Sequence, residues 1–216
     1  MNTIKGVLFD LDGTLIDSEF FYFTGWSAIL EKDYNLKLIY EDWLRDFAGH
    51  TLNHNVKVLN EMYNLNIDEE EMWFATRAAY ANASMKNIRL MPYAKELLQN
   101  CRERKLKVGL VTSSYQTTVD AVLGEHKLLK YFSFFVTREL VENPKPNPEP
   151  YLLALEKIGL PKENIVVVED TSTGCTAAKE AGLYCIAVSK HEIERARLQH
   201  ADILLNDLAE VKNSLL

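Results

Sequence analysis

Short, predominantly apolar runs alternate with amphipathic segments from about residue 91 to the end of this chain. Residues 165–168 are the clearest such run, and residues 106–111 and 184–188 are two others. Between the runs, apolar residues recur at i, i+3, i+4 and i+7, the spacing of one helix face. Strands that are apolar on both sides need cover on both faces of their sheet, and intervening helices supply it. The pattern predicts an α/β fold with a Rossmann-like core, in which helices cover both faces of a parallel sheet.

The elements of this core follow from the same periodicity. The expected strands are residues 4–9, 106–111, 134–136, 165–168, 184–188 and 203–204. A helix is expected over residues 116–126, and three more have core-facing positions at Ala94, Leu97, Leu98 and Cys101, at Tyr151, Ala154, Leu155 and Ile158, and at Gly174, Ala177, Ala178 and Ala181.

Residues 17–90 differ from the rest because they read as almost entirely helical. Asp68 is a plausible N-cap for a helical run that extends to Lys86. This segment separates the first strand from all the others, so it is interpreted as an insertion. We expect a catalytic core made of residues 1–16 and 91–216 and an inserted helical domain of residues 17–90.

Composition excludes several classes of protein. The chain has 216 residues, of which 47% are hydrophobic and 25% charged, as in an ordinary globular protein. A formal net charge of −7 argues against general binding of nucleic acid, and no apolar stretch reaches membrane-spanning length. The three cysteines form no C-x-x-C pair and are predicted to be buried, reduced thiols. These features favour a cytoplasmic protein, whose oligomeric state the sequence does not indicate.

Polar clusters follow the expected strands at the points where ligands bind in parallel sheets. They are Asp10-Leu11-Asp12-Gly13-Thr14, Thr112-Ser113-Ser114, Lys145 in a proline-rich loop, and Glu169-Asp170. A divalent cation held by Asp10, Asp170 and Glu169 would let a carboxylate approach a phosphate, and oxygen ligands suit Mg²⁺. Lys145 would add positive charge at the phosphate oxygens, while Thr112 and Ser113 would offer donors at a helix N-terminus. Together the clusters indicate phosphoryl transfer.

Each cluster also has a simpler reading. Asp-Gly-Thr alone is typical of a turn, a lone lysine is usually solvated, and the Thr112 and Glu169 clusters resemble helix N-caps or strand ends. Four prolines alternate around Lys145, which stiffens its loop. Because cis peptide bonds are largely confined to X-Pro, we also expect that Lys145-Pro146 is cis.

In this order, the clusters resemble the four motifs of the haloacid dehalogenase-like superfamily, in its phosphatase and phosphomutase branches. The first cluster matches the first motif, Thr112 the second and Lys145 the third. The fourth motif corresponds to Glu169-Asp170-Thr171-Ser172-Thr173-Gly174, continuing to Gly182. The resemblance extends from Val7 to about Val188, and the inserted segment resembles the α-helical cap domain of that family.

The resemblance implies a role for each matching residue. Asp10 would be the nucleophile that forms an aspartyl-phosphate, and Asp12 the general acid and base. Asp10, the Asp12 backbone carbonyl and Asp170 would ligate Mg²⁺, with Glu169 bound either directly or one layer further out. The phosphoryl oxygens would be held by Thr112, the Ser113 backbone and Lys145.

The implied activity is a Mg²⁺-dependent phosphatase that hydrolyses a small phosphorylated metabolite. A dehalogenase typically lacks the second aspartate, and a phosphonate hydrolase would want a cap lysine, whereas this chain has none between Lys5 and Lys32. A β-phosphoglucomutase-like sugar phosphomutase remains an alternative, although Tyr22 and Leu52 stand where an ungapped alignment expects its histidine and arginine. A non-catalytic binding or regulatory protein on the same fold is the third reading.

Overall fold

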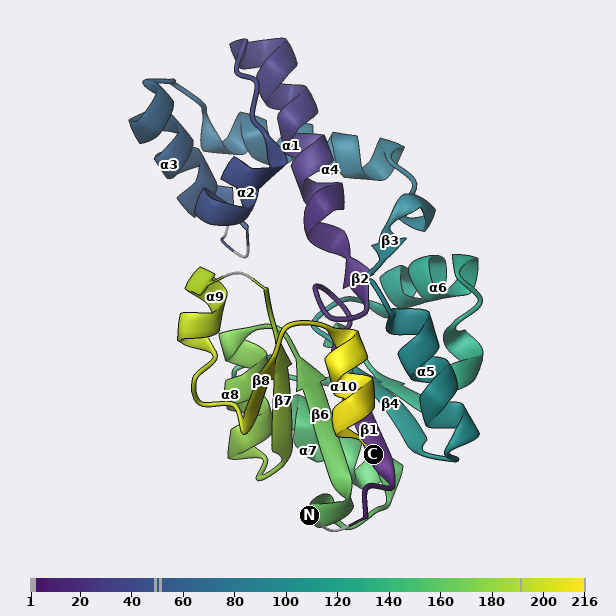
Figure 1. The fold of residues 1–216 in the computed structure, drawn as a ribbon. Coiled ribbons are helices and arrows are strands. Elements are labelled where there is room, and N and C mark those ends of the chain that lie inside the picture. The colour runs from purple at the N-terminus through teal and green to yellow at the C-terminus, as the bar shows by residue number, and fades with distance from the viewer. Residues whose placement is uncertain (1–2, 49, 51, 191, 216) are drawn as a thin grey trace. The chain divides into compact units, whose positions relative to one another are not determined.

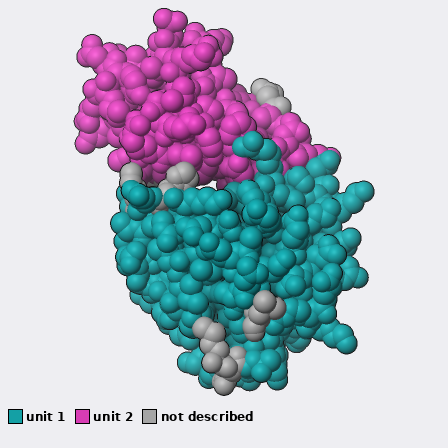
Figure 2. Space-filling model, viewed as in Figure 1, with its two compact units in different colours: residues 1–16, 89–216 teal, residues 17–88 magenta. Residues whose placement is uncertain are grey.

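The computed structural model describes residues 3–48, 50, 52–190 and 192–215. The chain divides into two compact units, a core unit of residues 1–16 and 89–216 and an inserted unit of residues 17–88 (Figure 2). The second boundary lies two residues before the one expected from the sequence. Just after this boundary, Arg89 and Leu90 form a short strand, β3 (Arg89–Leu90), that pairs with β2 (Ile16–Asp17) in a two-stranded sheet.

The core unit is built on a parallel sheet of six strands in the order β5-β4-β1-β6-β7-β8. The α/β fold expected from the sequence is therefore confirmed. Its strands are β1 (Gly6–Phe9), β4 (Lys107–Val111), β5 (Phe134–Val136), β6 (Ile165–Glu169), β7 (Tyr184–Val188) and β8 (Ile203–Leu205). Most side chains of β1, β4, β6 and β7 are buried, as their largely apolar sequences require.

Helices cover both faces of this sheet (Figure 1). Helices α5 and α10 contact each other on one face, while α7 and α8 contact each other on the opposite face. The helices of the core unit are α5 (Ala94–Glu103), α6 (Gln116–Glu125), α7 (Glu149–Ile158), α8 (Ser172–Glu180), α9 (Glu192–Arg197) and α10 (Leu208–Ser214). Single 3-10 turns lie at η2 (Leu129–Tyr131), η3 (Arg138–Leu140) and η4 (Lys162–Asn164).

Helix α6 begins at Gln116, as expected from the sequence, but its N-terminal cap differs from the simpler sequence-based reading. The Thr112-Ser113-Ser114 cluster does not cap this helix, which begins at Gln116 after Tyr115 at the N-cap position. The carboxylate of Glu139 accepts a hydrogen bond from the Gln116 backbone N–H instead, at 2.9 Å. The cap therefore comes from a residue remote in sequence, which a local motif cannot reveal.

Strand register aligns the polar clusters. Phe9, the last residue of β1, pairs with Leu110 on one side and with Val168 on the other. The backbone N–H of Asp10 continues this ladder by donating to the Val168 carbonyl at 3.0 Å. Asp10 therefore lies level with the carboxyl ends of both neighbouring strands, at the edge where parallel sheets bind ligands.

The inserted unit is helical. Its elements are α1 (Ser18–Tyr34), α2 (Tyr40–Asp46), α3 (Leu52–Tyr63), α4 (Glu69–Asn82) and η1 (Met85–Asn87). Asp68 caps α4 as expected, because its side chain accepts from the Glu71 N–H at 2.9 Å. The helical run expected to reach Lys86 instead ends at Asn82 and is followed by the 3-10 turn. The unit has its own apolar core, which includes Trp26, Leu30, Trp43, Phe47, Leu59 and Met72.

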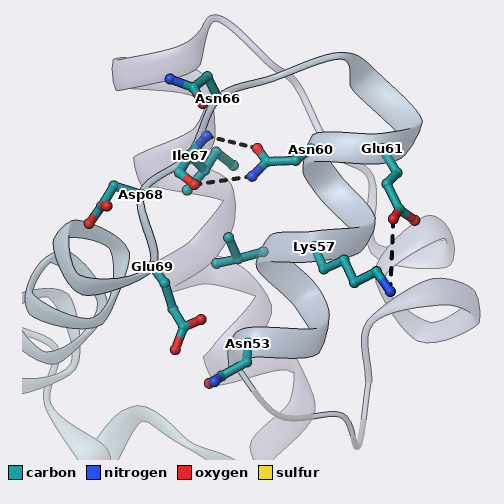
Figure 3. Close-up of a pocket in the computed structure, with 9 residues that line it drawn as sticks. Asn53, Lys57, Asn60, Glu61, Asn66, Ile67, Asp68 and Glu69 are labelled. Carbon is teal, nitrogen blue, oxygen red and sulfur yellow. Dashed lines mark hydrogen bonds and ion pairs between the residues drawn. The ribbon is translucent and has the colours of Figure 1, made fainter.

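A groove of about 490 Å³ lies within the inserted unit, between α3 and the start of α4 (Figure 3). Asn60 fixes the segment that leads into α4. Its side-chain amide donates to the Ile67 carbonyl at 3.0 Å and accepts from the Ile67 N–H at 2.7 Å. Lys57 and Glu61 form a loose ion pair at 3.9 Å. None of the site residues expected from the sequence lines this groove.

Within the described residues, no helix is both long and apolar enough to cross a bilayer. The cytoplasmic location stays a prediction.

The three cysteines are buried free thiols, as the sequence predicts. Burial raises the pKa of Cys101 to about 12, and Cys185 donates a hydrogen bond to Cys175 between sulfur atoms 3.6 Å apart. Because the thiolate is the reactive species, we expect no thiol of the native protein to react with a thiol-disulfide reagent at neutral pH. The same reagent should titrate three thiols after unfolding in guanidinium. Rapid labelling of the native chain would contradict this assignment.

Candidate active site

Lys145 and Asp10 form a buried ion pair at the carboxyl edge of the sheet. The Lys145 ammonium lies 2.6 Å from Asp10 Oδ1, and its side chain is only 5% exposed. The lysine lies in the loop between η3 and α7, in a stretch that brings four prolines together. The Lys145-Pro146 peptide bond is cis, as expected from the sequence.

The Lys145 ammonium makes two further contacts. It donates to the Val111 carbonyl at 2.8 Å and to Glu169 Oε1 at 2.6 Å. A lysine ammonium has three donors, so Asp10, Val111 and Glu169 use all of them. These contacts join the ends of β1, β4 and β6 through one cation.

Glu169 is fully buried and surrounded by donors from the protein itself. Its Oε1 atom accepts from Lys145 and also from the Tyr151 hydroxyl, the latter at 2.8 Å. Its Oε2 atom accepts from the Asp170 N–H at 3.2 Å and from the N–H and hydroxyl of Thr171 at 3.4 and 3.2 Å. Gly174 makes room for this carboxylate, because a Cβ there would collide with it.

Asp170 lies beside the first cluster of the sequence. Its Oδ1 atom accepts from the Thr14 hydroxyl at 3.0 Å. Gly13 has φ of +79°, and a Cβ at that position would collide with Asp170 Oδ2. A glycine is therefore needed here both for the backbone conformation and for the close approach of the acid.

Asp12 is held by the loop that follows β4. The Ser114 hydroxyl donates to Asp12 Oδ2 at 2.8 Å, and the Thr112 hydroxyl lies 3.5 Å from the same oxygen. Thr112 is itself fixed, because its hydroxyl accepts from the Ser114 N–H at 3.0 Å. Ser113 is exposed, so Ser114 rather than Ser113 provides the side chain that reaches Asp12.

Burial and neighbouring charges shift the pKa values of Asp10, Asp170 and Lys145. Burial raises the pKa of Asp10 well above its ordinary value; Lys145 pulls it down, while the charges of Glu169 and Asp12 raise it. Burial likewise raises the pKa of Asp170, and Asp10 and Glu169 add to the effect. Burial opposes the charge of Lys145, but Asp10 and Glu169 outweigh it and raise the pKa of the ammonium above its ordinary value. If Asp10, Glu169 and Asp170 were all ionised, the cluster would carry more negative charge than a single lysine neutralises.

The structure thus brings four of the site residues expected from the sequence into one cluster, namely Asp10, Lys145, Glu169 and Asp170. Asp12 and Thr112 form an adjoining group with Ser114. Sequence reasoning missed Ser114 and Tyr151. Ser114 was visible only as the third hydroxyl of its cluster, and Tyr151 only as a core position of a helix.

The acidic cluster has the donors of a cation site. Asp10, Glu169 and Asp170 each offer a carboxylate oxygen, and these oxygens lie within 4.8 Å of one another. Such hard oxygen donors suit Mg²⁺. Such a group of acids, on the edge of a parallel sheet beside a lysine, is a candidate for the class of site that holds a cation and an anionic ligand together.

Comparison with known families supports that class. The family model of the haloacid dehalogenase-like hydrolases matches residues 7–188. The chain therefore belongs to this family of enzymes, and the resemblance seen in its four motifs is confirmed.

Individual relatives match over nearly the whole chain. A phosphorylated carbohydrates phosphatase of Thermotoga maritima is 30% identical over 217 residues, covering 98% of each chain. Validoxylamine A 7′-phosphate phosphatase of Streptomyces hygroscopicus subsp. limoneus is 31% identical over 212 residues, covering 96% of each. Among solved structures, a Thermotoga maritima protein provisionally named a β-phosphoglucomutase is 29% identical, with a TM-score of 0.80 and 98% of each chain covered.

Proposed function

We propose that this enzyme is a Mg²⁺-dependent phosphatase that hydrolyses small organic phosphate monoesters through an aspartyl-phosphate. The observation that carries the proposal is the buried Asp10–Lys145 pair, which lies beside Asp170 at the carboxyl edge of the sheet. A carboxylate nucleophile needs positive charge nearby to approach a phosphate, and Lys145 supplies part of it.

In the first step, a carboxylate oxygen of Asp10 forms a bond to phosphorus while the ester P–O bond breaks. Asp12 gives its proton to the departing alcohol oxygen. In the second step, Asp12 takes a proton from water, whose oxygen attacks phosphorus and releases Asp10 and inorganic phosphate. The Ser114 hydroxyl holds Asp12 Oδ2 for this proton transfer.

Asp10 and Asp170 are the side chains that would hold Mg²⁺, together with the Asp12 carbonyl. The hydrogen bonds described above use only Oδ1 of Asp10 and of Asp170. The second carboxylate oxygen of each residue remains for a cation. When bound, the cation supplies charge neutralisation at the phosphoryl oxygens. Thr112 and the Ser113 backbone would bind the same oxygens.

Glu169 has a different role in this proposal. Donors of the protein surround both of its oxygens, so coordination of a cation would require breaking buried hydrogen bonds. We assign Glu169 to fixing Lys145 rather than to direct ligation.

Phosphorylated carbohydrates are the first substrates to test, because one relative is named for them and another for validoxylamine A 7′-phosphate. The similar structure provisionally named a β-phosphoglucomutase keeps sugar phosphomutase as a second candidate. The two activities differ in product: a phosphatase releases inorganic phosphate, whereas a mutase yields an isomeric sugar phosphate.

The decisive experiment is a panel of metabolite monoesters, each incubated with Mg²⁺ or with a chelator. Released phosphate and isomerised sugar phosphates are measured in the same samples. Phosphate release that requires Mg²⁺ is expected. Isomerisation of β-glucose 1-phosphate without release would favour the mutase, and inactivity on every ester with every divalent metal would favour a binding protein.

Ser114→Ala is expected to lower kcat about tenfold with little change in KM, the size of one hydrogen bond to a charged group. The reason is that Asp12 loses the hydroxyl that orients it. Ser114→Thr keeps a hydroxyl and should recover most of the rate, while Ser133→Ala, at an exposed serine, should have no effect. A rise in KM at constant kcat would instead make Ser114 a substrate ligand.

A further inference from the structure

Tyr151 is a fully buried tyrosine of α7 whose hydroxyl contacts the acidic cluster. This hydroxyl donates to Glu169 Oε1 at 2.8 Å, and the same oxygen accepts from the Lys145 ammonium at 2.6 Å. The ammonium also lies 5.1 Å from the centre of the Tyr151 ring. Tyr151 therefore touches both members of the ion pair that connects Glu169 to Lys145.

We propose that Tyr151 is a positioning residue for Lys145. Its hydroxyl fixes the Glu169 carboxylate, and its ring restricts the movement of the Lys145 ammonium. Lys145 therefore stays directed at Asp10. This inference rests on the phosphatase activity proposed above, in which Lys145 must face the phosphoryl group beside Asp10.

The hydrogen bonds around Glu169 explain why the hydroxyl matters. Oε2 is held by groups of the β6–α8 connection, the N–H of Asp170 and the N–H and hydroxyl of Thr171. On Oε1, Tyr151 is the donor that accompanies Lys145. Without the tyrosine hydroxyl, Oε1 would keep Lys145 as its donor from α7 and the loop before it. The Glu169 carboxylate would then be free to rotate, and the Lys145 ammonium would move with it.

The ring contributes separately. An ammonium within about 6 Å of an aromatic ring centre is attracted to its face, and Tyr151 presents that face while Asp10, Val111 and Glu169 occupy the three N–H donors. Burial and the negative charges of Glu169 and Asp10 raise the pKa of the tyrosine. The hydroxyl consequently stays protonated as a donor.

A tyrosine that only fills the core would behave differently on substitution. Tyr151→Phe keeps the ring and the packing but deletes the hydroxyl. We expect kcat to fall about tenfold, the equivalent of one hydrogen bond to a charged group, while KM changes less than about twofold. Tyr151→Leu, which also removes the ring, should lower kcat further.

A control variant and a second readout separate an effect on the position of Lys145 from an effect on the stability of the fold. Ile158→Val removes a methylene from another buried side chain of α7; it should lower the melting temperature but leave kcat unchanged. The second readout is the ¹⁵N resonance of the Lys145 side chain in metal-free protein, identified by its loss in Lys145→Arg. A buried, hydrogen-bonded ammonium exchanges slowly with water and gives a sharp signal, which Tyr151→Phe should shift and broaden.

An unchanged kcat together with an unchanged Lys145 resonance in Tyr151→Phe would overturn the proposal. The proposal would also be overturned if Tyr151→Phe lowered the melting temperature as much as Ile158→Val does and, like that control, left kcat unchanged. If the wild-type enzyme releases no phosphate from any ester, the phosphatase proposal fails, and the resonance alone still decides whether Tyr151 positions Lys145.

Discussion

The Asp10→Asn variant is expected to lose phosphatase activity by at least about four orders of magnitude, the scale on which removal of a nucleophile acts. An amide of nearly the same size replaces the carboxylate, so packing at the end of β1 is kept while the nucleophilic oxygen is lost. The loss should appear in kcat across all active esters, because the same group attacks each of them. Phosphate release under saturating substrate is the measurement.

The fold should survive this substitution. Asp10 is buried beside the negative charges of Glu169 and Asp12, and burial has already raised its pKa, so a neutral group relieves repulsion while it weakens the bond to Lys145. Thermal unfolding checks this point. Asp120→Asn, at an exposed aspartate of α6 that accepts from Gln116, is the matched control and should leave activity unchanged. A folded Asp10→Asn protein that still hydrolyses esters would remove Asp10 as the nucleophile.

The sheet and its ligand edge were predictable because their signals are local. Each buried strand is a largely apolar run, and β5 and β7 begin and end where the sequence places them. The polar residues after such runs must meet at one edge, since all six strands are parallel. The sequence alone therefore groups Asp10, Glu169 and Asp170 at this edge, and the proline-rich loop draws attention to Lys145.

The finer contacts were not predictable because they depend on how remote elements pack. Tyr151 follows the helical core spacing like any apolar residue, and only the approach of α7 to β6 brings its hydroxyl to Glu169. Ser114 reaches Asp12 because the loop after β4 turns toward β1, whereas Ser113 points outward. Glu139 caps α6 from another loop. Such contacts have no fixed spacing along the chain, so no local pattern encodes them.

Lys145→Met is expected to lower the free energy of unfolding by about 3–5 kcal/mol at neutral pH, the range for removing one partner of a buried ion pair. The methionine occupies the same path without its charge, and Asp10 and Glu169 then lose their shared counter-charge. Denaturant unfolding in metal-free buffer measures the effect. Phosphate release should fall as well, because the charge that admits a phosphate beside Asp10 is gone.

The same variant should be less affected in mild acid. A carboxyl whose folded pKa lies above its unfolded value stabilises the fold at low pH and loses that contribution as the pH rises through the folded value. The pKa of Asp10 is already raised by burial against the pull of Lys145, so removing the lysine raises it further and enlarges the penalty toward neutral pH. Lys179→Met is the matched control, because it breaks an ion pair with Asp202 in which the Lys179 side chain is 35% exposed. This variant should lower the free energy of unfolding by about 1 kcal/mol or less. An equal, pH-independent loss in both variants would show that Lys145 contributes packing rather than charge to the cluster.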